Sequence, residues 1–462
     1  MPIPRRPAHS LPPRVVIAAT HSGAGKTTVV TGLLAALRRA GIRVAGAKVG
    51  PDYIDPGYHR LASGRPSYNL DLWICGAQAV LASAARAGAG TDLLVVEGVM
   101  GLFDGAADGT ASSTADVARL LDAPVVLVVD AASAGQSVAA TVHGFASFDP
   151  GIRVAGVILN RVGSDRHEEL LRAALADRGV SVLGALRRDD RLAWRDRHLG
   201  LVPVAEQPAG LHRALERLAE TIRTHIDLAA LQAIAATAPP LRVELPAVAP
   251  LDPVVRVGIA SGPAFSFIYP DNLDALRRAG AKLVPFDPLV DRHLPPELGG
   301  VIVGGGFPEV YASELAANEP LLVDLRERVR SGLVVWAECG GLIWLSRSLD
   351  GQAMAGVIDA EATMTGRLTL GYRRVTTRRT TPLGPAGTRL RGHEFHYSSV
   401  RPEGDVFELD SREGTTLAGF GGPRLLASYV HVHLAGQEAL AQRFVDTCRA
   451  SRSPTLVEER RG

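Results

Sequence analysis

The sequence predicts an α/β protein made of two successive units, the first of which is a doubly wound parallel sheet. Short apolar runs rich in β-branched residues alternate with segments of helical periodicity along most of the 462 residues. A glycine-rich loop joins the first such run to a helix. An Ala- and Pro-rich stretch at 229–253 then separates this unit from a second series of strands and helices.

The length requires more than one hydrophobic core. We expect a flexible N-terminus at 1–13, a first domain at 14–228, a linker at 229–253, a second domain at 254–445 and a tail at 446–462. A net charge of +2 gives no basic surface that would indicate nucleic acid as a partner. No secretory h-region or membrane-spanning run is present, so the expected location is cytoplasmic, without a membrane partner.

Residues 15–31, VVIAATHSGAGKTTVVT, predict a strand, a phosphate-binding loop and the start of a helix. The glycines let backbone N–H groups point at phosphates, Lys26 supplies a cation, and the Thr27 hydroxyl is placed to ligate Mg²⁺. Thr20 stands where the first glycine of the usual motif would be. The alternative is an ordinary strand-to-helix turn. The residues expected to bind a nucleotide here are Thr20, Ser22, Gly23, Gly25, Lys26, Thr27 and Thr28.

The next short strand, 41–48, ends in a loop with Pro51, Pro56 and two carboxylates, Asp52 and Asp55. Loops at the carboxyl ends of parallel strands carry function in α/β sheets. The carboxylates would lie close to the γ-phosphate, and Tyr53 would line a pocket. Turn-forming Asp beside Pro is the structural alternative.

Residues 91–105 repeat this pattern, with Glu97 at the end of a buried strand, where P-loop enzymes keep an acidic Mg²⁺ ligand. Asp104 follows between glycines and is a candidate for orienting substrate, or a turn residue. Ser113 lies at an expected helix N-terminus, where it would receive a substrate carboxylate or simply cap the helix. Asn160 ends a later strand and is suited to hydrogen-bond an adenine edge, although such residues are common at strand ends.

The second unit contains a cysteine at a sharp turn. Residues 332–345, GLVVWAECGGLIWL, run from a buried strand through Cys339 into a helix, a position that exposes a nucleophile and favours its thiolate. The backbone N–H groups of Gly305, Gly306 and Gly340 are candidates for an oxyanion site, with close strand–helix packing as the alternative. Cys75 and Cys448 lack such surroundings and are expected to be structural.

A nucleophilic cysteine needs a base. His431 and His433 lie near the C-terminus in SYVHVHLAG, and His393 and His396 lie in GHEFHYS. Residues i and i+2 of a strand share a face, so spacing alone leaves His431 and His433 equivalent.

Seven segments in order resemble the cobyrinic/hydrogenobyrinic acid a,c-diamide synthases, and the resemblance spans about residues 14–440. They are ATHSGAGKTT, KVGPDYIDPGYH, VVEGVMGLFDG, GGGFPE, AECGGLIWL, GHEFHYS and SYVHVHLAG. The resemblance implies a dethiobiotin-synthetase-like P-loop domain followed by a class I glutamine amidotransferase domain. In such enzymes glutamine is hydrolysed at the thiol and ammonia moves internally to a carboxylate that MgATP has phosphorylated.

The resemblance assigns roles by motif. Its substrates are ATP, L-glutamine and a corrinoid-precursor macrocycle, with Mg²⁺ as cofactor; a homodimer is left open. Thr27, Asp52 and Glu97 would hold the metal, and Tyr53, Asp104 and Ser113 would face the substrate.

Cys339 would be the nucleophile and His431 its base. Related enzymes often place an acid two residues after that histidine; since position 433 is His, we expect a Cys–His pair without a third carboxylate, with His433 as the second candidate base.

Two alternatives remain at this stage. A sister ligase would amidate another tetrapyrrole, such as nickel-sirohydrochlorin, or carry out the later amidations that give cobyric acid; the PDYIDP loop favours the a,c enzyme over the latter. A partitioning-type ATPase would need neither Cys339 nor the second unit.

Overall fold

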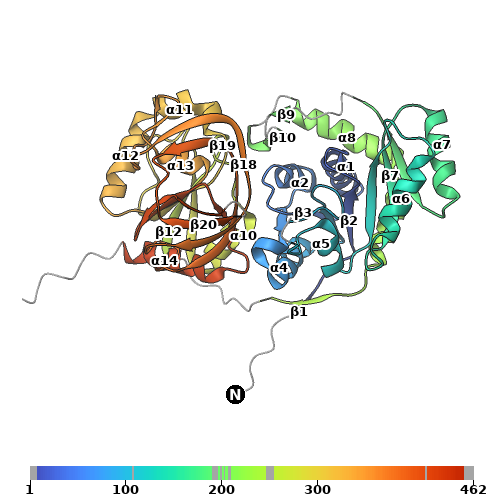
Figure 1. The fold of residues 1–462 in the computed structure, drawn as a ribbon, viewed down its shortest axis with the longest axis horizontal. Coiled ribbons are helices and arrows are strands. Elements are labelled where there is room, and N and C mark those ends of the chain that lie inside the picture. Colours follow the sequence, from blue (N-terminus) through green and yellow to red (C-terminus); the bar gives the residue numbers. More distant parts are fainter. Residues whose placement is uncertain are drawn as a thin grey trace, which may run out of the picture. The chain divides into compact units, whose positions relative to one another are not determined.

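The computed structural model describes residues 8–106, 109–189, 196–197, 200–201, 203–206, 210–245, 254–411 and 414–451. The chain forms two compact units, Met1–Ala247 and Val248–Gly462 (Figure 1). The division falls within 229–253, the range expected as a linker.

The core of unit 1 is a seven-stranded sheet in the order β4-β3-β5-β2-β6-β7-β8, with every pair of neighbours parallel. Alternate residues of β2 pack into different cores: Val16 and Ala18 on one face, Val15 and Ile17 on the other. A parallel sheet buried on both faces needs continuous apolar strands, which is why this sheet is visible in the sequence. The strands are β2 (Arg14–Ala19), β3 (Val44–Val49), β4 (Tyr68–Leu70), β5 (Leu93–Glu97), β6 (Val125–Asp130), β7 (Val154–Val162) and β8 (Val182–Arg187).

Helices cover both faces of this sheet. One face packs against α1 (Lys26–Arg39), α2 (Asp55–Ser63), α8 (Leu211–His225) and α9 (Leu228–Ala236). The other packs against α4 (Ala77–Gly88), α5 (Thr114–Leu120), α6 (Ser137–Ser147) and α7 (Asp165–Ala176), with the short α3 (Leu72–Cys75) before α4. The doubly wound arrangement predicted from the sequence is therefore present.

The boundaries of unit 1 differ from those expected. Strand β1 (Ala8–Ser10) pairs antiparallel with β11 (Arg242–Glu244), although 1–13 and 229–253 were expected to lie outside the domains. Leu231 and Ala235 of α9 are buried in the core, which places the start of the expected linker in unit 1. The smallest elements of this unit are β9 (Asp196–Arg197), β10 (Gly200–Leu201) and the 3₁₀ helix η2 (Val204–Glu206).

Unit 2 contains a six-stranded sheet in the order β13-β12-β14-β15-β23-β22, parallel except for the antiparallel pair β22–β23. Its strands are β12 (Val255–Ala260), β13 (Ala281–Phe286), β14 (Leu298–Val303), β15 (Val334–Glu338), β22 (Phe420–Gly422) and β23 (Leu425–Ser428). One face packs against α11 (Ala312–Ala317), α12 (Glu319–Arg330) and α13 (Gly340–Leu345), which follow η3 (Pro308–Tyr311). The other packs against α10 (Pro270–Arg278) and α14 (Glu438–Ala450), which runs into the expected tail.

A second sheet in unit 2 was not predicted. It has the order β17-β16-β18-β19-β24, and β20 joins β18 to β21. The antiparallel pair β19–β24 sets His393 opposite His431 and so brings two of the candidate histidines together. Its strands are β16 (Ser348–Leu349), β17 (Gln352–Ala353), β18 (Glu361–Thr377), β19 (Arg389–Arg401), β20 (Phe407–Ser411), β21 (Gly414–Ala418) and β24 (His431–Val432).

Within the part of the chain that the structure describes, no helix has the length and apolar character needed to cross a membrane.

Candidate active sites

The phosphate-binding loop of unit 1 has the conformation that its glycines predict. Gly23 and Gly25 have φ values of 80° and 94°, which side-chain-bearing residues rarely adopt. A Cβ on Gly25 would lie 2.2 Å from Asn160 Nδ2, whose amide donates to Ala24 O at 2.9 Å. Asn160 of β7 therefore lies against the loop, near the position expected for the nucleotide.

Lys26, the first residue of α1, folds back over this loop. Its Nζ donates to Met100 O at 2.5 Å and to His21 O at 3.5 Å. Burial, assisted by the positive charge of Lys48, lowers the pKa of Lys26 to about 8. A phosphate oxygen would satisfy this ammonium better than two carbonyl groups do, because the charges are opposite.

Oxygen atoms from three elements meet at Thr27. Its Oγ1 donates to Glu97 Oε1 at 2.8 Å and to Asp55 Oδ2 at 3.2 Å. The described residues contain no group of three or more His, Cys, Asp or Glu side chains able to hold a metal by themselves. Mg²⁺ commonly takes one or two carboxylates and completes its shell with phosphate oxygens and water. Thr27, Glu97 and Asp55 fit that requirement.

Two buried basic side chains contact these carboxylates. Lys48 Nζ lies 2.6 Å from Asp55 Oδ2 and 2.8 Å from Glu97 Oε1, and His59 Nε2 lies 2.6 Å from Glu97 Oε2. Although burial opposes charge, Lys48 and His59 hold the pKa of Glu97 well below its usual range, and Asp55 and Glu97 raise the pKa of Lys48. Burial and the charges of Asp52 and Glu97 raise the pKa of Asp55 well above normal. A divalent cation would relieve this repulsion.

Lys48 and His59 are not among the expected site residues, and the expected metal ligand is Asp52, whereas the carboxylate that contacts Thr27 is that of Asp55. Asp52 Oδ1 accepts from the N–H groups of Ile54 and Asp55 at 2.8 and 2.9 Å, which is the turn-forming alternative. Lys48 and His59 lie in the same quoted segment, KVGPDYIDPGYH. Their positions depend on the pairing of β3 with β5, which no local pattern reveals.

The remaining candidates of unit 1 lie in local turns and caps. Asp104 is exposed and its Oδ2 accepts from Gly101 N at 2.8 Å. Ser113 forms a reciprocal N-cap of α5 with Asp116. Thr20 Oγ1 contacts His21 Nδ1 at 2.9 Å. Ser22 is exposed, and Tyr53 and Thr28 are half-buried.

Cys339 occupies the predicted sharp turn between β15 and α13. Its φ and ψ of 50° and −103° lie outside the regions that L-residues favour. Its N–H is bonded to Ser428 O at 2.8 Å, and its Sγ lies 3.9 Å from Phe395 O. A strained residue held this way at a helix start is typical of a nucleophile. Cys448 is buried in α14, where burial raises its thiol pKa, as expected of a structural residue.

The glycine candidates divide into two groups. A Cβ on Gly340 would lie 3.1 Å from Gly306 N, so these two backbones touch beside the cysteine. The N–H of Gly305, however, is already bonded to Phe267 O at 3.1 Å. Gly305 is therefore a poor oxyanion donor, and Gly306 and Gly340 remain as the candidates.

His431 lies at the cysteine, and His433 does not. Burial disfavours the imidazolium, but the hydrogen bond and charge of Cys339, with Glu338 beside it, raise the pKa of His431 to about 10. Nδ1 of His431 lies 3.6 Å from Glu338 Oε2. A carboxylate therefore lies beside His431, although the expectation was a Cys–His pair without a third one. His433 Nε2 instead lies 3.7 Å from Asp271 Oδ2, and its ring packs on Tyr269 with the centroids 4.2 Å apart.

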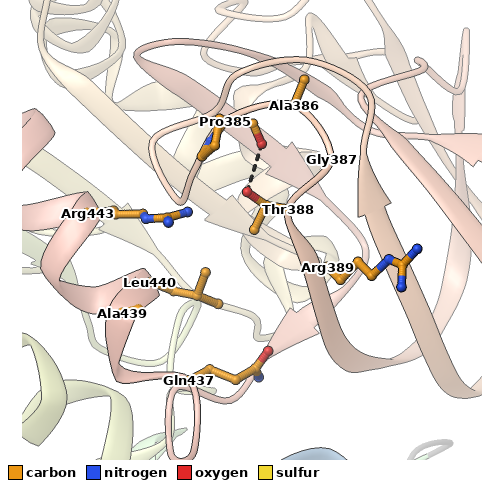
Figure 2. A pocket seen from close by; sticks show the side chains of 9 residues that line it. All are labelled: Pro385, Ala386, Gly387, Thr388, Arg389, Gln437, Ala439, Leu440 and Arg443. Carbon is orange, nitrogen blue, oxygen red and sulfur yellow. Dashed lines mark hydrogen bonds between the residues drawn. The ribbon is translucent and has the colours of Figure 1, made fainter.

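A hollow of about 440 Å³ on unit 2 is separate from this chemistry (Figure 2). Neither Cys339 nor His431 lines it, and one of the loops that line it contains the bond from Thr388 Oγ1 to Pro385 O at 2.7 Å. The lining residues are Pro385, Ala386, Gly387, Thr388, Arg389, Gln437, Ala439, Leu440 and Arg443.

Comparison with known proteins identifies the same two parts. Residues 15–201 match the CobQ/CobB/MinD/ParA nucleotide binding domain, and residues 256–439 match the CobB/CobQ-like glutamine amidotransferase domain. Hydrogenobyrinate a,c-diamide synthase of Streptomyces coelicolor is 48% identical over 95% of this chain and 98% of its own length. The chain belongs to the cobyrinate/hydrogenobyrinate a,c-diamide synthase family.

Another relative in this family, the cobyrinate a,c-diamide synthase of Syntrophotalea carbinolica, is 44% identical over 95% of this chain and 99% of its own length. Among solved structures, a glutamine amidotransferase is 22% identical, with a TM-score of 0.31, over 42% of this chain and 98% of that one. The family predicted from the motifs is thus confirmed over nearly the whole chain.

Proposed function

We propose that this protein uses MgATP and glutamine to convert the a- and c-acetate carboxylates of cobyrinate or hydrogenobyrinate into amides in cobalamin biosynthesis. The observation that carries the proposal is the presence of two complete centres in one family member. One is the phosphate loop with the Thr27, Glu97 and Asp55 oxygens, and the other is Cys339 with His431. A switch-type ATPase would use the first centre and has no use for the second.

Unit 2 supplies ammonia in this proposal. The Cys339 thiolate attacks the side-chain amide carbon of glutamine, and the N–H groups of Gly306 and Gly340 stabilise the oxyanion. As the C–N bond breaks, His431 gives its proton to the amide nitrogen, which leaves as ammonia, and a thioester to Cys339 remains. His431 then takes a proton from water, which attacks the thioester, and glutamate leaves as Cys339 is restored.

Unit 1 activates the carboxylate. The phosphate loop and Lys26 position the γ-phosphate, and Thr27, Glu97 and Asp55 would hold Mg²⁺, which neutralises phosphate charge during transfer. An acetate oxygen of the macrocycle takes the γ-phosphoryl group from ATP, and ammonia then attacks the acyl carbon and displaces phosphate. We assign Asn160 to the adenine side, and Tyr53, Asp104 and Ser113 to the face where the macrocycle binds.

The test is to incubate the purified protein with MgATP and glutamine and with one macrocycle at a time. The macrocycles are cobyrinate, hydrogenobyrinate and nickel-sirohydrochlorin, and the amide groups gained are counted by mass spectrometry. We expect two amides on cobyrinate or hydrogenobyrinate. Amidation of nickel-sirohydrochlorin alone would assign the protein to a sister reaction, and ATP turnover without amide formation on any macrocycle would contradict the proposal.

A further inference from the structure

We propose that Glu338 is the positioning residue of the glutaminase centre, holding His431 through Nδ1 so that the other ring nitrogen faces Cys339. The proposal rests on the proposed role of Cys339 in hydrolysing glutamine. It gives the orienting function to the residue that directly precedes the nucleophile in the chain. It also explains how the site functions with a histidine at position 433.

The carboxylate of Glu338 is fixed by a hydrogen bond at one oxygen and lies beside the His431 ring with the other. Oε1 accepts from the backbone N–H of Val432 at 2.9 Å, and Oε2 lies 3.6 Å from His431 Nδ1. Glu338 is the last residue of β15 and is only 5% exposed, while His431 is 1% exposed. A buried carboxylate must be paired, and the bond to the residue after His431 keeps it beside this ring.

The His431 ring is held from other directions as well. A Cβ on Gly305 would lie 2.6 Å from His431 Cε1, so only glycine leaves room for the ring there. The ring of His393 stacks on it with the centroids 5.0 Å apart. Burial, with the charges of His431 and His433, lowers the pKa of His393 well below normal, so this neighbour is a neutral ring.

A different acid, Asp271, lies beside the second histidine, His433. Its Oδ2 lies 3.7 Å from His433 Nε2, and the other ring nitrogen of His433 accepts from Ala435 N at 3.2 Å. His433 thus lies beside α10, and the histidine that is hydrogen-bonded to Cys339 is His431. The two histidines have separate acids, and Glu338 is the one at the thiol.

A carboxylate at Nδ1 favours the imidazolium, and the imidazolium favours the thiolate. The groups facing His431 are Cys339 and Glu338 from the β15 turn, and His393, Glu394 and His396 from β19. Glu338 is the acid in contact with the ring, since the Glu394 carboxylate is bonded to Arg373 Nε at 2.7 Å. Removing the Glu338 charge should move thiolate formation to higher pH.

The experiment compares Glu338→Gln with the matched control Asp271→Asn in the full-length protein. The rate of Cys339 alkylation by iodoacetamide is measured against pH, alongside kcat and KM for glutamine hydrolysis. For Glu338→Gln we expect the alkylation midpoint to rise and kcat to fall about 10- to 100-fold at little cost in KM. The loss should stay below the ~10⁴-fold seen when a serine triad loses its acid charge, because a thiol is more acidic. Asp271→Asn should leave the pH dependence of Cys339 alkylation unchanged.

Folding is monitored by ammonia-dependent amidation and by thermal melting, and Glu338→Asp, which keeps the charge, should recover part of the alkylation shift. An unchanged profile and kcat in folded Glu338→Gln would overturn the proposal, and so would an equal shift in Asp271→Asn. A rise in KM alone would place Glu338 in glutamine binding and also overturn it. Alkylation needs no macrocycle, so this result is independent of whether the amidation substrate is correct.

Discussion

The Lys26 ammonium group donates to two main-chain carbonyl groups beside the phosphate-binding loop. Its partners are the carbonyl oxygens of Met100 and His21, at 2.5 and 3.5 Å. Met100 itself has a φ of 49°, so the chain after Glu97 is bent to present this oxygen. The loop thus keeps a desolvated ammonium in place for a phosphate group, which explains why this residue should matter to every ATP-dependent step.

Lys26→Ala should abolish amidation with glutamine and with ammonium salt alike, because the γ-phosphate loses its cation whatever the nitrogen source. We expect a loss of at least about 100-fold in product formation, of the size found when one stabilising donor is removed. Product is measured by mass spectrometry, and glutaminase activity should persist. Lys282→Ala, at an exposed position of β13, is the matched control. Near-normal ammonia-dependent amidation in Lys26→Ala would show that this loop does not bind the reacting phosphate.

Substitutions of Asp55 and of Asp52 should differ in their effect on amidation, although only three positions separate the two residues. Asp55 contacts Thr27 and Lys48, whereas the Asp52 side chain accepts from backbone N–H groups. Asp55→Asn should therefore cut amidation by about 10-fold or more and raise the Mg²⁺ concentration needed for half-maximal rate. Asp52→Asn should retain most of the turn, since an amide oxygen also accepts. The measurement is amidation rate against Mg²⁺ concentration. Equal Mg²⁺ dependence in the two variants would return the ligand role to Asp52.

At the level of elements, both centres are strand-to-helix turns at the carboxyl ends of parallel strands. Glycines make each turn possible: Gly25 before α1, and Gly340 and Gly341 at the start of α13. A Cβ on Gly341 would lie 2.3 Å from Val303 O, so α13 could not pack on β14 with any larger residue there. The geometry of the cysteine turn thus depends on close packing at the second residue after Cys339.

Gly341→Ala should displace α13 and with it Cys339. We expect about 1–3 kcal/mol of lost stability in unit 2, the usual cost of overpacking, together with loss of glutaminase activity. Thermal melting and glutamate release are the measurements. Gly366→Ala in β18 is the control, because a Cβ there meets nothing within 4 Å. A Gly341→Ala protein with unchanged melting and turnover would show that the close approach is not needed.

Local sequence patterns predicted the parallel sheets and both turns, because buried parallel strands are continuous apolar runs and the motifs lie where they end. They did not predict the sheet of β18 and β19. Most of β18 is exposed or half-buried, so its 17 residues lack a regular apolar alternation. For the same kind of reason Lys48, His59 and Glu338 were not assigned roles: their partners come from strands or helices distant in sequence, and the sequence does not show the register that joins them.

At the level of the whole molecule, each unit has cores of its own and contains the residues of one proposed centre. Thr27, Glu97, Asp55, Lys48 and His59 all belong to unit 1, and Cys339, His431 and Glu338 belong to unit 2. The two chemical steps should therefore be separable by mutation.

Cys339→Ala should lose glutaminase and glutamine-dependent amidation, yet form product with a high concentration of ammonium salt at a pH where free NH₃ is appreciable. His431→Ala should behave alike, because an unassisted thiol with a pKa of ~8.5 is mostly protonated at neutral pH. His433→Ala should be milder. The readouts are glutamate release and amide gain. Continued use of glutamine by Cys339→Ala would mean that the nucleophile is wrongly assigned, and failure with ammonia in a folded, ATP-binding protein would mean that the centres are coupled.

Strand β1 pairs with β11, so the chain leaves unit 1 beside the place where it enters. Arg14 strengthens that closure: its buried guanidinium donates to Leu121 O at 2.5 Å and to Pro239 O at 2.8 Å. A domain whose first and last strands pair with each other tolerates a chain break, or replacement of the domain that follows, just beyond its last strand. If the two units are encoded as separate polypeptides divided after Ala247, the β1–β11 pair of unit 1 should therefore remain intact. Unit 2 could then be replaced by the amidotransferase domain of a relative.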